Sequence, residues 1–363
     1  MLNDDERRAI RNINSELLAT TINNINSYEK QQRIGNILKF IGELPEASDR
    51  FDRGVRNLDV RVATAIMLES NPEHIEAFEE MIGTHRKYKE EQPEHSKAAD
   101  NYLIKNFTEV VFNNAGHDAV ETFKGIKEAI SVSKNILENH SKGEQLTKES
   151  TMNLYAKEMG DSKHFPLEQI GVDVEKVNAI LNSDSPAEQK YSMLLAHVYS
   201  SSTQHRLGPE QSKDTTVSFT DKVIKANLNY GFKDKESYDS KDVAEIKQVV
   251  QNIGTAAARN KEDEKAFSQE LNKQFDPIIK DLKKGERNFL QKIGHAISKC
   301  LKKIFGTKKE PLAELISELD QKSKDTLKKI AKVTKENADL TKGSTTTSHS
   351  TPNNKKQESR MSR

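Results

Sequence analysis

The sequence predicts an all-α protein, built as a multi-helix bundle or an elongated helical array, with a C-terminal helical hairpin and a disordered tail. Three observations support this prediction. Apolar residues recur at helical spacing along most of the 363 residues, and capping residues and prolines stand at the ends of these runs. Apolar residues make up 34% of the chain and charged residues 31%, so we expect thin cores of the kind that bundles have.

The first 140 residues have the pattern of a series of amphipathic helices. Asn3 followed by Glu6 predicts a capping box at the start of the first helix. Pro72 suits the first turn of a later helix, a single long helix is expected after Pro93, and Gly116 predicts a break. Apolar residues are spaced by three and four in runs at 10–25, 34–41, 55–66, 75–82, 102–111 and 120–137.

The second half contains further helices separated by polar stretches. Residues 141–150 are polar and indicate a loop or domain boundary, after which apolar residues recur from Leu154 to Leu181. The stretch 200–216 is rich in Ser, Thr, Gln and Gly and predicts a second loop, and the alternation from Thr215 to Phe219 indicates a short strand. Helices are expected again at 243–253 and from about 257 to Pro277.

These boundaries predict four parts of the chain. We expect an N-terminal helical domain, a second helical region with a polar loop near 200–216, a basic amphipathic helical hairpin, and a tail too polar to bury a core. Their ranges are 1–140, 151–277, 280–340 and 341–363.

Composition excludes several classes of protein. The single cysteine rules out an intramolecular disulfide and favours a reducing compartment. The N-terminus lacks a basic region followed by an apolar run, so no secretory signal is expected, and no apolar window is long enough to predict a membrane span. A net charge of +1 argues against a dedicated nucleic-acid binder.

Motifs for catalysis or cofactor binding are missing from the sequence. The ten histidines form neither an HExxH motif nor a zinc-ligand spacing, and neither a phosphate-binding loop nor a dinucleotide fingerprint occurs. We therefore predict no catalytic, cofactor-binding or metal-binding residue. Whether the protein is an enzyme stays open, with a non-enzymatic role favoured.

The segment from 280 to 309 gives the clearest indication of function in the sequence. It carries ten Lys or Arg residues against two acids, and its apolar residues lie on one face of a helix. That combination is typical of a helix that lies on an anionic membrane or contacts a partner. The predicted contact residues are Phe289, Leu290, Ile293, Ile297, Cys300, Leu301, Ile304 and Phe305 on the apolar face, and Lys292, Lys299, Lys302 and Lys303 on the basic face.

A structural alternative exists for the same helix. Amphipathic helices more often face a core, and a helix at 312–340 could cover the apolar face after a turn between Gly306 and Pro311. Cys300, on that face, is either an acylation site that would supply a second membrane anchor or a small buried residue. The two interpretations differ in one property, the exposure of the apolar face.

Residues 65–91 resemble the fourth-helix region of the regulator-of-G-protein-signalling domain. Glu69, Ile75, Phe78 and Tyr88 fall near the acidic, apolar and aromatic positions of that family. His74 stands where the family has the Asn that steadies the switch region of a Gα subunit. The resemblance implies a regulator of a host GTPase.

The overall composition resembles another class. The chain is rich in Lys and Asn and ends in GSTTTSHSTPNNKKQESRMSR, with Met361 third from the end. In this it is similar to the effectors that intracellular bacteria deliver through Dot/Icm-type IV secretion systems. That resemblance implies synthesis in the cytoplasm, delivery into a host cell and a peripheral position at a membrane.

We therefore expect a non-enzymatic helical interaction protein, a scaffold or adaptor at an anionic membrane surface with a protein partner that the sequence does not identify. The alternatives are regulation of a host GTPase and nucleic-acid binding through the Lys-rich C-terminal region, where stacking aromatics are sparse.

Overall fold

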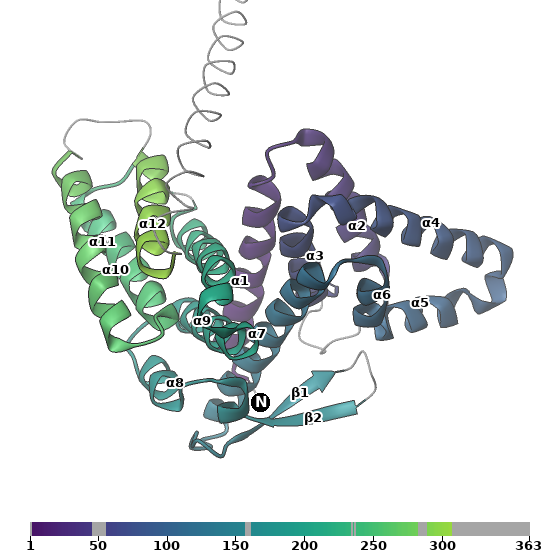
Figure 1. Ribbon diagram of the computed structural model, residues 1–363, viewed down its shortest axis with the longest axis horizontal. Helices are drawn as coiled ribbons and strands as arrows, with labels where there is room; N and C mark the ends of the chain where they lie inside the picture. The colour runs from purple at the N-terminus through teal and green to yellow at the C-terminus, as the bar shows by residue number, and fades with distance from the viewer. Residues whose placement is uncertain are drawn as a thin grey trace, which may run out of the picture. The chain divides into compact units, whose positions relative to one another are not determined.

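Twelve α-helices and one two-stranded β-hairpin form the part of the chain that the computed structural model describes (Figure 1). That part comprises residues 2–45, 56–156, 161–233, 235, 237–281 and 289–306. The all-α prediction is confirmed. The described residues up to 306 form one unit. The predicted helix at 312–340 and tail at 341–363 lie outside the described residues.

The described residues between Asp4 and Ser141 form helices joined by short turns. The predicted capping box is present, because Asn3 Oδ1 accepts from the Glu6 N–H at 2.8 Å and Glu6 Oε2 accepts from the Asn3 N–H at 3.0 Å. Pro72 and Pro93 each open a 3-10 turn, and Gly116 precedes a long helix, as predicted. The elements are α1 (Asp4–Asn23), α2 (Tyr28–Glu43), α3 (Leu58–Ser70), η1 (Pro72–His74), α4 (Ile75–Glu91), η2 (Pro93–His95), α5 (Ser96–Lys105), α6 (Phe107–Asn114) and α7 (His117–Ser141).

The second half contains the hairpin and five more helices. The strands pair antiparallel, with Thr151 opposite Pro166 and Ala156 opposite Asp161. The elements are β1 (Thr151–Ala156), β2 (Asp161–Pro166), η3 (Leu167–Ile170), α8 (Val174–Leu181), α9 (Ala187–Phe232), α10 (Ser240–Ala257), α11 (Lys261–Asp281) and α12 (Phe289–Phe305).

Helix α9 is the central element of the core. Helices α1, α7, α10 and α12 all pack against it, so the predicted ranges 1–140 and 151–277 share one hydrophobic core. Tyr191, fully buried on α9, donates its hydroxyl to Asn14 Oδ1 of α1 at 3.0 Å. A buried hydrogen bond between such distant parts of the sequence fixes the register of α1 on α9.

The predicted loop at 200–216 and the predicted strand from Thr215 to Phe219 are wrong. Both stretches belong to α9, which bends at Gly208 (φ 77°, ψ 168°) and resumes at Pro209. Polar composition misled the prediction, because the Ser and Thr side chains of this stretch are largely buried. Such hydroxyls can hydrogen-bond to carbonyl oxygens inside a protein, as Ser200 does with Ala257 at 2.9 Å.

Two other expectations also need correction. The single helix predicted after Pro93 is two helices, because Asn106 ends α5 and its Nδ2 donates to the Tyr102 carbonyl at 2.9 Å. The start of the apolar run at Leu154 belongs to the β-hairpin, where Leu154 pairs with Lys163. Met152 of β1 is fully buried, and β1 packs on α7.

Candidate functional site

An apolar groove lies between α4 and α5 and is closed at one end by α6. Helix α4 ends at Glu91, the turn η2 reverses the chain at Pro93, and α5 returns beside α4 (Figure 1). The groove has a volume of about 830 Å³. This α4–α6 groove is lined by Glu80, Met81, Thr84, His85, Tyr88, His95, Ala98, Ala99, Tyr102, Leu103, Val110 and Asn114.

Two of the residues that line the groove are exposed tyrosines. Tyr88 of α4 is 46% exposed and Tyr102 of α5 is 66% exposed, whereas Leu103 is buried. Tyrosine offers a large apolar ring and a polar tip at low cost in conformational entropy, which makes it common at protein interfaces. Glu80 is the one carboxylate among the lining residues, and it is exposed. The groove therefore presents an apolar floor between two tyrosines.

A polar cluster holds the two walls of the groove together. Asp100 of α5 lies 2.8 Å from His85 Nε2 and accepts from Lys89 Nζ at 2.7 Å and 2.8 Å, and both partners are on α4. Burial opposes the charge on Asp100, but the hydrogen bonds from Lys89 and His85 outweigh it and hold the pKa of Asp100 below its ordinary value. The lining residues include neither Ser nor Cys, so the His85–Asp100 pair has no such nucleophile to activate. The cluster positions the helices.

The predicted contact helix, α12, is packed into the protein through its apolar face. Helix α12 lies against α11 and α9. Cys300 is fully buried, and Ile304 is partly buried. The structure therefore supports the packing alternative, with α9 and α11 as the covering helices. The side chains of Phe289 and Leu290 lie outside the described part. The buried members of the predicted face are Ile293, Ile297, Cys300, Leu301 and Phe305.

The basic face of α12 divides into two groups. Lys292, Lys299 and Lys302 are exposed. Lys303 instead forms an ion pair with Glu270 of α11, a carboxylate that is 6% exposed and also accepts from Gln274 Nε2 at 2.7 Å. The Lys303 hydrogen bond, which outweighs desolvation, holds the pKa of Glu270 below its ordinary value. The side chain of Lys303 is 57% exposed as well, but its ion pair with Glu270 joins α12 to α11.

Cys300 is chemically protected. Burial, reinforced by the nearby charge of Glu270, raises the pKa of its thiol to about 12. Because the thiolate is the reactive form, a thiol in this environment reacts slowly at neutral pH. The acylation interpretation requires a thiol accessible to an acyl donor, which the folded unit does not present.

The positions that resemble the G-protein regulator family are mostly used in packing. Ile75 and Phe78 are buried, and Glu69 pairs with Lys222 Nζ of α9 at 3.2 Å. The Gly116 N–H donates to His74 Nε2 at 3.3 Å. Of the four matching residues, only Tyr88 is exposed, and it lines the α4–α6 groove. The GTPase-regulator alternative stays a prediction.

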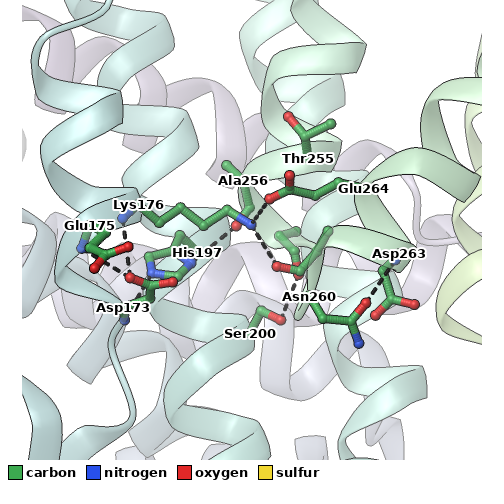
Figure 2. A network of polar contacts seen from close by, with 12 residues as sticks. Asp173, Glu175, Lys176, His197, Ser200, Thr255, Ala256, Asn260, Asp263 and Glu264 are labelled. Carbon is green, nitrogen blue, oxygen red and sulfur yellow. Dashed lines mark hydrogen bonds and ion pairs between the residues drawn. The ribbon is translucent and has the colours of Figure 1, made fainter.

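A second polar cluster surrounds His197 at the C-terminal end of α10 (Figure 2). His197 Nε2 accepts from the Asp173 N–H at 3.2 Å, and Nδ1 lies 3.1 Å from the Ala256 carbonyl oxygen. Lys176 Nζ donates to the Ala258 carbonyl oxygen at 2.7 Å and to Glu264 Oε1 at 2.8 Å. These side chains satisfy carbonyls that a helix end leaves without an internal partner. The cluster caps α10 and joins it to α8, α9 and α11.

Sequence reasoning did not identify the α4–α6 groove. The sequence features that belong to the groove are Tyr88, Tyr102 and the Gln92-Pro93 break, after which α5 folds back along α4. The sequence does not show that the two tyrosines are exposed. The spacing of apolar residues marks which residues are buried, but two helices must be placed in space before a groove between them exists.

Comparisons with known protein families, with curated proteins and with solved structures found no match for this chain. None of the described helices combines the length and hydropathy that a membrane span requires. Within the described residues, no three His, Cys, Asp or Glu side chains come together in a way that could hold a metal ion.

Proposed function

We propose that the protein is a helical interaction protein, an adaptor or scaffold, that binds an amphipathic helix of a partner protein in the α4–α6 groove. The observation that carries the proposal is the apolar floor between Tyr88 and Tyr102 at the surface of a unit whose other large apolar residues are mostly buried. Exposed apolar patches of this kind often mark interaction sites.

The shape of the groove favours a helix as the occupant. Two neighbouring helices form its walls, and an amphipathic helix can lay residues at i, i+3, i+4 and i+7 between them. The charge of the lining favours a basic residue at the edge of the bound helix. Glu80 is the one carboxylate among the lining residues, and within the described part of the chain it forms no ion pair. The Asp100 cluster ties the walls together, so little order needs to be gained on binding.

Peptide selection tests this proposal. A library of random peptides displayed on phage is selected against the protein and counter-selected against a Tyr88→Ser/Tyr102→Ser variant. We expect the retained peptides to have apolar residues at helical spacing with a Lys or Arg beside them. Their affinity should fall at least tenfold in the variant, since exposed aromatic residues dominate such interfaces. Tyr28→Ser is the matched control, because Tyr28 is 74% exposed on α2, away from the groove lining. Peptides that bind the variant as tightly as the wild type, or a selection without helical spacing, would contradict the proposal.

A second candidate role follows from the exposed lysines of α12. Because the apolar face is buried, we propose that any contact of α12 with an anionic membrane is electrostatic and uses Lys299 and Lys302 without insertion. Flotation with phosphatidylserine vesicles should then weaken in a Lys299→Glu/Lys302→Glu variant and at raised salt. Lys303 is left intact because its charge pairs with Glu270. Equal flotation of the two forms would exclude this role.

Regulation of a host GTPase remains an alternative. It predicts that the protein accelerates GTP hydrolysis by a candidate G protein, and the absence of acceleration at stoichiometric protein counts against it.

A further inference from the structure

The outer half of the hairpin formed by α4 and α5 has no core of its own. It comprises residues 83–91 of α4 and 96–102 of α5, and in these two ranges, which the structure describes in full, every residue is exposed or half-buried. The buried residues of the two helices, such as Phe78 and Leu103, all lie in the inner half. Short helices are marginally stable in water without tertiary packing. A surface that covers the outer half would supply this packing, and a second copy of the chain is available wherever the protein is made.

The outer face of α4 has both parts of a contact between helices. Met81, Thr84 and Tyr88 follow one another at steps of three and four, so they form a ridge with the spacing that the α4–α6 groove accepts. The same three residues line the groove, and on α5 its lining includes the small residues Ala98 and Ala99. A surface that carries both a ridge and a groove can contact itself across a two-fold axis, where each contact occurs twice.

The charges of α4 favour an antiparallel arrangement of two such helices. Glu80 is exposed and forms no ion pair within the described part of the chain. Lys87 is seven residues further along, is 75% exposed, and lies 3.8 Å from Glu91. If the two-fold axis passes between residues 83 and 84, Glu80 of one copy stands opposite Lys87 of the other. The dimer then contains two such ion pairs, whereas a parallel pair would place like charges together.

Gly83 permits a close approach of the two helices at the axis. It lies inside α4, where glycine is less favourable than alanine, and a Cβ at its position would meet no atom within 4 Å. Its φ is not positive, so neither backbone conformation nor packing within one chain requires glycine here. Thr84, the next residue, is exposed and small. The backbone of a second helix can come closest where the side chains between the two helices are small.

We propose that the protein forms a symmetric dimer in which the α4–α5 hairpins of two copies pack antiparallel. Each copy places the ridge from Met81 to Tyr88 in the α4–α6 groove of the other. This inference rests on the proposed function, since it takes the groove as a site for a helix, and it names a second copy of the chain as an occupant. Tyr88 and Tyr102, which are 46% and 66% exposed in the single chain, become part of the core of a four-helix bundle. A partner's helix then binds only when the dimer opens.

Sedimentation velocity of the full chain over a range of concentrations tests this inference. The wild type should form a dimer. Glu80→Lys places positive charges opposite each other and Lys87→Glu places negative charges opposite each other, so each variant alone should weaken the dimer at least tenfold. An equimolar mixture of the two variants should form a heterodimer with an affinity within a few-fold of the wild type, because both ion pairs are then restored. Glu245→Lys and Lys241→Glu are the matched controls, exposed on α10 outside the groove lining, and each should dimerise as the wild type does.

A further variant tests the close approach at the axis. Gly83→Gln introduces a good helix former at an exposed position, so the helix content measured by circular dichroism should be unchanged. The longer side chain separates the two helices, so the dimer should weaken about tenfold.

Two results would overturn the dimer. One is a wild type that stays monomeric at the highest concentration measured, and the other is a dimer that the reversal variants do not weaken or that their mixture does not restore. The outcome is separable from that of the proposed function. A monomer whose groove still binds the selected helical peptides removes the dimer and leaves the adaptor role. A dimer with the expected charge dependence whose groove takes up no peptide supports the dimer and removes the adaptor role.

Discussion

His197 Nδ1 lies 3.1 Å from the carbonyl oxygen of Ala256, so the ring nitrogen must carry the proton in that contact (Figure 2). Nε2 accepts from the backbone N–H of Asp173 at 3.2 Å and therefore carries none. One neutral tautomer satisfies both contacts. Burial, reinforced by the charge of Lys176, lowers the pKa of His197 to about 4.

The stability of the protein should therefore depend on His197 in mildly acidic solution. The unfolded chain binds a proton at this residue below the ordinary pKa of about 6.5, while the folded protein does so only near 4. The stabilisation that neutral His197 gives to the folded protein is fully present above a pH of about 6.5. It is lost as the pH falls to about 4, and the free energy of unfolding decreases by roughly 3 kcal/mol in total. Urea unfolding of the wild type and of His197→Gln at several pH values measures it. The slope of unfolding free energy against pH over this interval should be shallower in the variant, and parallel curves would contradict the assignment.

Gly254 of α10 should not tolerate a side chain. A Cβ at this position would lie 2.1 Å from Cζ of Phe267, which is fully buried on α11. Gly254→Ala must displace the ring, and we expect a loss of about 1–3 kcal/mol in the free energy of unfolding. Gly294→Ala in α12 is the matched control, because no atom lies within 4 Å of its Cβ position. The control should gain up to about 1 kcal/mol from helix propensity. Equal effects in chemical denaturation would show that α10 and α11 are not packed in this way.

Cys300 should be unreactive in the folded protein. Its side chain is fully buried and the pKa of its thiol is raised to about 12, so little thiolate forms at pH 8. We expect slow modification by a maleimide in buffer and rapid modification in urea. Cys300→Ala should be better tolerated than Cys300→Ser, because the serine hydroxyl would enter an apolar site. Rapid labelling of the native protein would place the thiol at the surface and revive the acylation interpretation.

The helices followed from sequence where local signals were strong. Asn3 with Glu6 predicted the first helix start, and Gly116 and the prolines at 72 and 93 marked later ones, because caps and backbone restrictions act within one turn. The stretch around Gly208 was predicted wrongly for a physical reason. A run of Ser and Thr has low hydrophobicity whether it lies in solvent or is buried against neighbouring helices, and only tertiary contacts distinguish the two.

The candidate sites depend even more on tertiary structure. The spacing of Ile293, Ile297 and Cys300 correctly placed them on one face of α12, but the sequence could not say what that face contacts. The α4–α6 groove arises only when separate segments meet, as α4 and α5 do where His85 lies beside Asp100. Residue spacing within one helix does not encode such meetings.

Lys302 and Lys303, which are adjacent in the last turn of α12, should respond differently to mutation. Lys303 pairs with Glu270, which is 6% exposed, whereas Lys302 is exposed and no ion pair is recorded for it in the described residues. Lys303→Ala leaves the carboxylate with only Gln274 as a side-chain partner, so the unfolding temperature should drop by a few °C, while Lys302→Ala should change it little.

The pKa of Glu270 is lowered in the folded protein, so the stabilisation from its ion pair with Lys303 is present above the ordinary pKa of a glutamate. This stabilisation is lost as the pH falls through the pKa of Glu270 in the folded protein. The difference between the two variants should therefore shrink in acid, because a protonated Glu270 needs no cation. Thermal unfolding of both variants at neutral and acidic pH measures this. Equal unfolding temperatures at neutral pH would mean that the ion pair between Lys303 and Glu270 does not stabilise the folded protein.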